Sequence, residues 1–165
     1  MSAATIAYVG LGGNVGDAAA TLREAFTALD ALPDTRLLRA SRLYRTPAWG
    51  HREQPDFVNA AARLETRLDA RALLDALLEV ERQFGRDRGD GGERWGPRTL
   101  DLDLLLFGEA VIDEPGLRVP HPHLHERAFA LVPLAEIAPE AVVPGRGTVR
   151  SLAAEVAAEG IEALP

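Results

Sequence analysis

Apolar and polar positions along the chain repeat with two different periods. Short runs rich in β-branched and aromatic residues predict strands, and stretches with apolar residues three or four positions apart predict amphipathic helices. The predicted strands cover residues 5–11, 35–44, 56–66 and 100–107. The predicted helices cover residues 17–32, 69–84, 126–137 and 149–158. Proline disrupts helical hydrogen bonding, so the third helix is predicted to be interrupted or to end near Pro133.

The order of these elements indicates a fold class. The first six run β-α-β-β-α-β, which is typical of a ferredoxin-like α+β sandwich with one antiparallel sheet and helices on one face. The two middle strands are joined by a loop without a helix, so we expect them to pair antiparallel and not as part of a doubly wound parallel sheet. The later elements are C-terminal helical additions. We expect residues 1–165 to form a single domain.

The glycines that follow the first predicted strand resemble a phosphate-binding loop only superficially. The stretch GLGGNVGD begins at residue 10, and its glycines are residues 10, 12, 13 and 16 of the chain. This spacing does not fit the G-x-G-x-x-G fingerprint of dinucleotide-binding proteins. We interpret this stretch as a tight turn between strand and helix.

Composition and charge narrow the classes of protein further. The chain is 47% hydrophobic and 26% charged, as in soluble globular proteins, and no apolar run approaches the roughly 18 residues that a membrane span needs. A net charge of -7 disfavours nucleic acid and membrane partners. The chain has no cysteine, and its N-terminus lacks a signal-peptide pattern. We therefore expect a cytoplasmic protein.

One segment departs from this acidic balance. Between residues 82 and 98, five arginines and three acidic residues give a local net charge of +2. Such a run is usually a solvated loop with ion pairs, and a site for an anionic ligand is the alternative. All 18 basic residues of the chain are arginine. The absence of lysine excludes P-loop enzymes, Schiff-base enzymes and protein kinases.

Two aspartates stand at the start of the fourth predicted strand. Residues two apart in a strand face the same side, so Asp101 and Asp103 share a face with Cα atoms roughly 6–7 Å apart, and Leu105 and Phe107 continue it. Two carboxylates this close repel each other unless a cation lies between them. Hard oxygen ligands point to magnesium. Alternatively, both aspartates are solvated or paired with the preceding arginines.

Three segments carry a resemblance to a known family. They are YRTPAWGHREQPDFVNAA at 44–61, RWGPRTLDLDLLLFG at 94–108 and VPHPHLHERAFALVPLAEIAP at 119–139. With them the chain, from Tyr8 to about Pro144, resembles the 6-hydroxymethyl-7,8-dihydropterin pyrophosphokinase family of folate biosynthesis. The resemblance implies transfer of a pyrophosphoryl group from the co-substrate ATP to the hydroxymethyl group of the pterin. The products would be AMP and the pterin diphosphate, with two Mg²⁺ ions as cofactors.

The resemblance also assigns roles to residues. It implies that Asp101 and Asp103 hold the metal ions and form the catalytic set together with Arg86 and Arg98. The implied ATP contacts are Glu81, Arg86, Arg88, Arg98, His121 and Arg127. The implied pterin contacts are Thr46, Pro47, Ala48, Trp49, Phe57, Asn59, Trp95 and Phe129. In this pattern the two phenylalanines sandwich the ring and Asn59 reads its edge. Four residues depart from the family pattern, namely Ala48, Trp49, Leu78 and Pro122.

Taken without the resemblance, the same residues allow other interpretations. Spacing alone makes Phe57 and Phe129 core residues and Glu81 an exposed helix acid. In an extended segment the alternating histidines at 121, 123 and 125 would share one face, which suits the zinc site of a metallohydrolase, although Pro122 weakens this interpretation. A non-catalytic ferredoxin-like module for a small ligand is the third possibility.

From the family resemblance we expect a monomer whose partners are ATP and the pterin.

Overall fold

The computed structural model describes residues 3–46, 56–85, 99–156, 158 and 160–165. The first part of the chain forms β1 (Thr5–Gly13), α1 (Ala18–Asp30), β2 (Thr35–Ala40), β3 (Tyr44–Thr46), β4 (Phe57–Thr66), α2 (Ala70–Gln83) and β5 (Asp101–Phe107). The second part forms β6 (Ile112–Glu114), β7 (Leu117–Val119), η1 (Leu124–Glu126), α3 (Ala128–Ile137), β8 (Val142–Val143), β9 (Gly147–Thr148), α4 (Val149–Glu155) and β10 (Glu162–Ala163).

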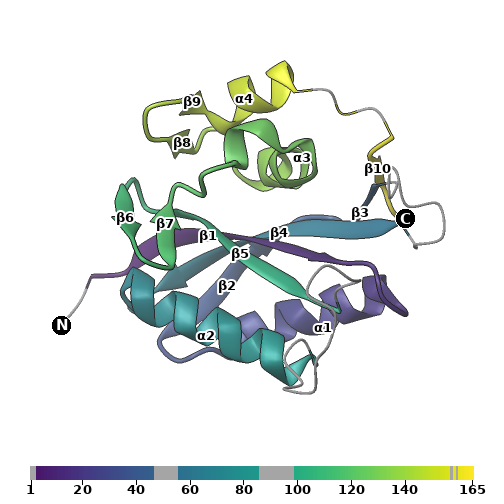
Figure 1. Ribbon diagram of the computed structural model, residues 1–165, viewed down its shortest axis with the longest axis horizontal. Coiled ribbons are helices and arrows are strands. Elements are labelled where there is room, and N and C mark those ends of the chain that lie inside the picture. The colour runs from purple at the N-terminus through teal and green to yellow at the C-terminus, as the bar shows by residue number, and fades with distance from the viewer. Residues whose placement is uncertain (1–2, 47–55, 86–98, 157, 159) are drawn as a thin grey trace.

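One six-stranded sheet runs through the centre of the molecule (Figure 1). Its order is β10-β3-β4-β1-β5, with β2 also paired to β4, and every pair is antiparallel. The predicted second strand corresponds to β2 and β3, so the core order is second-third-first-fourth, as in the ferredoxin-like sandwich. The predicted fold class and the antiparallel pairing of the two middle strands are confirmed.

Helices cover both faces of the sheet (Figure 1). On one face, α1 and α2 bury a cluster that includes Leu22, Leu29, Leu73 and Leu77. On the other face, α3 and α4 bury a smaller cluster that includes Leu131. No helix among the described residues is long and apolar enough to cross a membrane. The C-terminal additions thus form a second layer on the opposite face from the first two helices.

The first two helices begin where the sequence places an aspartate. Asp17 accepts a hydrogen bond from Ala20 N at 3.1 Å, and Asp69 accepts one from Ala72 N at 2.8 Å. Each carboxylate satisfies a backbone N–H that the helix itself leaves unpaired. These caps explain why both helices start within one residue of their predicted bounds.

Ser41 breaks the predicted strand 35–44 into two. The Ser41 N–H donates to Ala61 O at 2.9 Å, and the Ser41 Oγ accepts from Ala61 N at 2.8 Å. The hydroxyl therefore takes the place of a strand carbonyl, and the chain leaves the ladder at this point. The prediction of one continuous strand was wrong here because a short polar side chain competed with the backbone.

Pro133 does not interrupt α3, so that prediction was wrong as well. The helix runs through it to Ile137, while residues 124–126 form a separate 3₁₀ turn. Leu131 and Leu134 on either side of Pro133 are fully buried. Burial of this helix against the sheet outweighs the one hydrogen bond that proline cannot donate. The last predicted helix is also shorter than expected and ends at Glu155.

A register shift between Tyr8 and Val9 of β1 changes the alternation in β5. Leu102 and Leu104 pack in the cluster under α1 and α2, and Leu105 and Leu106 both join the cluster under α3. Phe107 therefore returns to the α1 and α2 side. The prediction that Phe107 continues the aspartate face was wrong. The irregularity lies between Leu104 and Leu106, and beyond it the side chains of β5 alternate in the opposite sense.

The end of α3 is bound to the strand that leads into the site. Tyr44 Oη donates to Glu136 Oε1 at 2.5 Å, and the Arg42 N–H donates to the same carboxylate at 3.1 Å. Burial favours the neutral form of Glu136, but these hydrogen bonds outweigh it, and the pKa of Glu136 is lowered. Because the pKa of Glu136 is lower in the folded protein than in the unfolded chain, the network contributes stability at pH values above the unfolded-state pKa. This contribution is lost as the pH falls through the folded-state pKa.

We expect Tyr44→Phe to lower the free energy of unfolding at pH 7 by about 1–2 kcal/mol, because the charged Glu136 loses a buried donor. The difference from wild type should shrink as the pH falls through the lowered pKa of Glu136, because the protonated carboxyl no longer carries the charge that the hydroxyl stabilises. Urea denaturation over a series of pH values from 7 downward measures this, with Tyr8→Phe as a control outside the network. A loss that stays the same at every pH would show that the Glu136 charge is not involved.

Candidate functional site

Two cavities meet at the edge strand β5. The sheet cavity, of about 360 Å³, is lined by Gly10, Leu11, Gly12, Thr46, Phe57, Asn59, Ala60, Asp101, Asp103, Leu105, Arg127, Phe129 and Ala130. The hairpin cavity, of about 680 Å³, is lined by Leu74, Leu102, Asp103, Leu104, Asp113, Glu114, Pro115, Gly116, Leu117, Arg118, His121 and Pro122. Asp103 lines both, so a molecule in one cavity lies next to a molecule in the other.

The two aspartates of β5 line the sheet cavity together. Both are partly buried, while Leu102 between them is buried on the opposite side. The cross-strand register sets Asp101 beside Gly12 and Asp103 beside Gly10 of β1. Since neither glycine has a side chain, the backbone of β1 forms the floor of the cavity next to the two carboxylates.

The opposite wall of the sheet cavity carries an aromatic pair and an amide. Phe57 and Asn59 come from the same face of β4, and Phe129 comes from the first turn of α3. Asn59 is 7% exposed, and its Nδ2 donates to Thr46 Oγ1 at 3.3 Å. Phe129 is 38% exposed, so the interpretation of this residue as core is wrong. A flat heteroaromatic ring with a polar edge is the ligand chemistry that suits these walls.

Arg127 brings a guanidinium group to the lining of the sheet cavity. Its Cζ stands 5.6 Å from the centre of the Phe129 ring, and the residue precedes the first turn of α3. A permanently charged planar group in this position suits phosphate oxygens. It places a positive charge on the same cavity as the two carboxylates.

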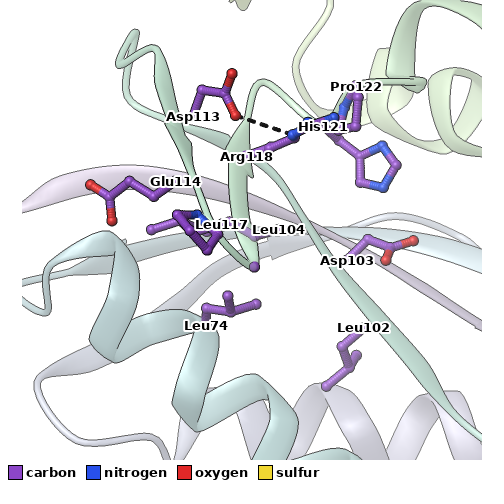
Figure 2. A pocket seen from close by; sticks show the side chains of 12 residues that line it. Leu74, Leu102, Asp103, Leu104, Asp113, Glu114, Leu117, Arg118, His121 and Pro122 are labelled. Carbon is purple, nitrogen blue, oxygen red and sulfur yellow. Dashed lines mark hydrogen bonds and ion pairs between the residues drawn. The ribbon is translucent and has the colours of Figure 1, made fainter.

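The β6–β7 hairpin forms one side of the hairpin cavity (Figure 2). Arg71 of α2 binds the turn of this hairpin by donating hydrogen bonds to Pro115 O at 3.0 Å and to Glu114 Oε1 at 3.2 Å. Arg118 pairs with Asp113 across the hairpin at 3.2 Å. Figure 2 shows His121 and Asp103 on the side of the cavity away from Glu114. This cavity is thus lined by leucines together with ionisable side chains.

His121 is fixed beside β5 in its neutral form. Its backbone N–H donates to Leu105 O at 2.9 Å, and its Nδ1 accepts from His123 N at 3.2 Å, so the ring proton is on Nε2. Burial lowers the pKa of His121, and Arg127 and His123 lower it further, whereas Asp103 acts in the opposite direction. The imidazole therefore offers a neutral N–H donor to the hairpin cavity at pH 7.

The histidine motif does not have the geometry of a zinc site. Residues 122–126 form a turn and a 3₁₀ helix instead of an extended segment, and His123 and His125 both lie against Glu126. Among the described residues no group of three His, Cys, Asp or Glu side chains could hold a metal ion. Magnesium needs only one or two carboxylates because waters and substrate phosphates complete its shell. The Asp101 and Asp103 pair fits magnesium held jointly with a phosphate ligand.

Glu81 of α2 lies behind the aspartates. It is 2% exposed and accepts a hydrogen bond at 2.6 Å from Leu102 N, the residue between the two carboxylates. The interpretation of Glu81 as an exposed acid is therefore wrong. Its carboxylate satisfies the backbone N–H of Leu102 and thereby fixes the backbone between Asp101 and Asp103. The contact of Glu81 with ATP stays a prediction.

Several predicted site residues lie outside the described part of the chain. They are Pro47, Ala48, Trp49, Arg86, Arg88, Trp95 and Arg98. Of the two other departures from the family pattern, Leu78 is 44% exposed on α2 and Pro122 lines the hairpin cavity. The roles of all these residues stay predictions.

The comparison with protein families decides the assignment. Residues 8–139 match the family model of 7,8-dihydro-6-hydroxymethylpterin-pyrophosphokinase (HPPK). The chain belongs to the HPPK family. It is 47% identical over 158 residues to the 2-amino-4-hydroxy-6-hydroxymethyldihydropteridine pyrophosphokinase of Pseudomonas aeruginosa, covering 96% of each chain. It is 46% identical to the enzyme of the same name from Methylorubrum extorquens, covering 96% of this chain and 98% of the other.

Solved structures of HPPK-containing proteins share the fold. The fold resembles the crystal structure of wild-type Plasmodium falciparum HPPK-DHPS with a TM-score of 0.73 and 14% identity, over 94% of this chain and 45% of that chain. The same protein with pteroate gives a TM-score of 0.73 and 13% identity, over 94% of this chain and 45% of that one. The chain therefore spans less than half the length of these longer proteins.

Sequence reasoning missed two parts of this HPPK site. Gly12 was assigned to the turn after a strand predicted to end at residue 11, whereas β1 continues to Gly13. Neither Gly12 nor Gly10 was predicted to line a cavity. The hairpin of β6 and β7 was not predicted, although Pro115 and Gly116 between two short apolar stretches are a turn signal that could have indicated it.

Proposed function

We propose that this chain transfers a pyrophosphoryl group from ATP to the hydroxymethyl group of 6-hydroxymethyl-7,8-dihydropterin, giving AMP and the pterin diphosphate in folate biosynthesis. Its membership of the HPPK family supports the reaction. The structural observation that carries the proposal is the position of Asp103, which lines both cavities. A two-substrate transfer needs two adjacent sites with the catalytic group at their junction.

The chemistry of each cavity suggests its occupant. The sheet cavity offers Phe57, Phe129 and the Asn59 amide to the flat pterin ring. The larger hairpin cavity, with apolar Leu74 and the His121 donor, suits the nucleotide. We place the ATP phosphates toward Asp103, so that the pterin hydroxyl oxygen forms a bond to the β-phosphorus. The bond from that phosphorus to the α-phosphate oxygen breaks, AMP leaves, and the hydroxyl proton is released.

The residues of the chain would orient the reactants and balance their charge. Asp101 and Asp103 would hold the two Mg²⁺ ions. The positive charge of these ions would offset the negative charge on the phosphate oxygens. Arg127, which lines the sheet cavity, would contact phosphate. Arg86 and Arg98 are proposed to do the same on the grounds of the family resemblance. The Nε2–H of His121 provides a neutral donor for the nucleotide.

Nucleotide products test this proposal directly. We expect the purified protein with ATP, magnesium and 6-hydroxymethyl-7,8-dihydropterin to form AMP in equal amount to the pterin diphosphate, and to form no AMP when the pterin is omitted. Liquid chromatography of the nucleotides measures both. Formation of ADP, or of AMP without the pterin, would contradict the transfer.

We also propose that residues 1–165 act as one domain and as a cytoplasmic monomer, with no nucleic acid or membrane partner. The acidic net charge of -7 supports the absence of polyanionic partners. Sedimentation of the purified protein at micromolar concentration tests the monomer.

A further inference from the structure

Gly12 occupies the centre of a row of residues that crosses the sheet cavity. In the register of the sheet it lies opposite Asn59 of β4 on one side and opposite Asp101 of β5 on the other. Cross-strand partners carry their side chains on the same face. Because Gly12 has no side chain, it leaves room on the floor of the cavity that a neighbouring side chain can occupy.

The backbone does not explain the glycine. Gly12 is in a regular strand and does not have the positive φ that favours glycine at Gly16 or Gly116. An alanine fits this backbone and normally strengthens a strand relative to glycine. The reason for glycine at this position must lie in the space around it.

The space around Gly12 is filled by one side chain. A Cβ atom at Gly12 would lie 2.9 Å from Asn59 Oδ1, which is closer than Cβ atoms approach other atoms in real proteins. The next nearest residue is Val58, whose carbonyl oxygen would lie 3.8 Å from that Cβ. The Asn59 amide would have to move, and it is buried with its Nδ2 donating to Thr46 Oγ1. A methyl group at Gly12 therefore acts on the amide and on little else.

We propose that Gly12 is a positioning residue of the pterin site, which holds the Asn59 amide in the orientation that reads the edge of the ring. This inference rests on the proposed function. It assigns specificity to a residue that would not touch the reacting atoms. Gly10, on the same face of the same strand, provides a contrast, because the three atoms nearest to a Cβ there all belong to the Leu105 side chain, the closest at an ordinary 3.4 Å.

The test is Gly12→Ala, with calorimetric binding of 6-hydroxymethylpterin and steady-state kinetics. We expect the variant to fold, to bind the pterin at least about tenfold more weakly and to raise its KM by a similar factor, because a buried polar contact is lost. The KM for ATP should stay within about twofold of wild type. Gly10→Ala, the matched control, should lose at least about fivefold less pterin affinity than Gly12→Ala.

A double-mutant cycle isolates the role of Asn59. In an Asn59→Ala background, Gly12→Ala should cause no further loss of pterin affinity, because the displaced group is already gone. The side-chain NH₂ resonances of Asn59 should shift in Gly12→Ala and not in Gly10→Ala. If Gly12→Ala fails to fold, the Asn59→Ala change should restore folding, and persistent unfolding of the double variant would overturn the inference.

Two further results would overturn it. Wild-type pterin affinity in Gly12→Ala would show that the amide does not depend on the glycine, and an equal loss in Gly10→Ala would show that a methyl group merely fills the cavity. Wild-type protein that makes AMP from ATP and the pterin, alongside either result, leaves the proposed function intact. Absence of pterin binding by the wild type would overturn both.

Discussion

Asp101→Asn and Asp103→Asn are each expected to lower turnover at least about a thousandfold while the protein stays folded. Asparagine keeps the shape of the side chain but removes one negative charge from a pair that lines the sheet cavity. Relief of repulsion between the carboxylates should leave the metal-free protein as stable as wild type or slightly more so. Turnover and urea denaturation measure the two effects.

A readout besides activity separates metal binding from structure. Mn²⁺ binding, followed by electron paramagnetic resonance without substrates, should weaken in both variants. Pterin affinity should change far less, because the residues proposed to contact the ring, Phe57, Asn59 and Phe129, keep their side chains. Asp75→Asn, on the exposed side of α2, makes the same change in net charge and is the control. Near-normal turnover in either site variant would mean that the aspartates are structural.

Phe129→Ala is expected to weaken pterin binding by about 2–4 kcal/mol, or roughly 30- to 700-fold, because an aromatic face and its buried area are removed. The cost in protein stability should be small, since the side chain is 38% exposed without ligand. Calorimetry with 6-hydroxymethylpterin and thermal unfolding measure the two quantities.

Phe107→Ala is the matched control for Phe129→Ala. Phe107 packs against the cluster under α1 and α2 and lies outside the lining of either cavity. Its removal should destabilise the protein and leave the pterin affinity of the folded fraction close to wild type. If Phe129→Ala destabilises the protein as much as Phe107→Ala and retains its pterin affinity, Phe129 is a core residue after all.

The order of elements was predictable because it depends on strong, local signals. Long periodic stretches with aspartate caps gave α1 and α2 nearly to the residue, and the short loop between the middle strands gave antiparallel pairing. The errors came from contacts with distant residues. The Oγ of Ser41 replaces a strand carbonyl opposite Ala61, and burial of α3 carries the helix through Pro133.

The site was predictable where chemistry and spacing coincide. Asp101 with Asp103, and Phe57 with Asn59, are pairs two residues apart, and strand geometry alone sets each pair on one face. Spacing and chemistry pointed to a site only for the aspartates, whereas Phe57 and Asn59 were assigned to one through the family resemblance. The burial of Glu81 could not be predicted, because its partner is a backbone N–H of a strand 21 residues away. The role of Gly12 depends on the register between β1 and β4, which one sequence does not specify.

The central claim is that the group transferred from ATP contains the β-phosphorus, and the label position in the products of [β-³²P]ATP tests it most directly. With magnesium and 6-hydroxymethyl-7,8-dihydropterin, we expect the label to appear in the pterin product and the AMP to be unlabelled. Label recovered in ADP would indicate transfer of a single phosphoryl group. Label recovered in free pyrophosphate, with no labelled pterin, would indicate hydrolysis, and either result would contradict the proposed function.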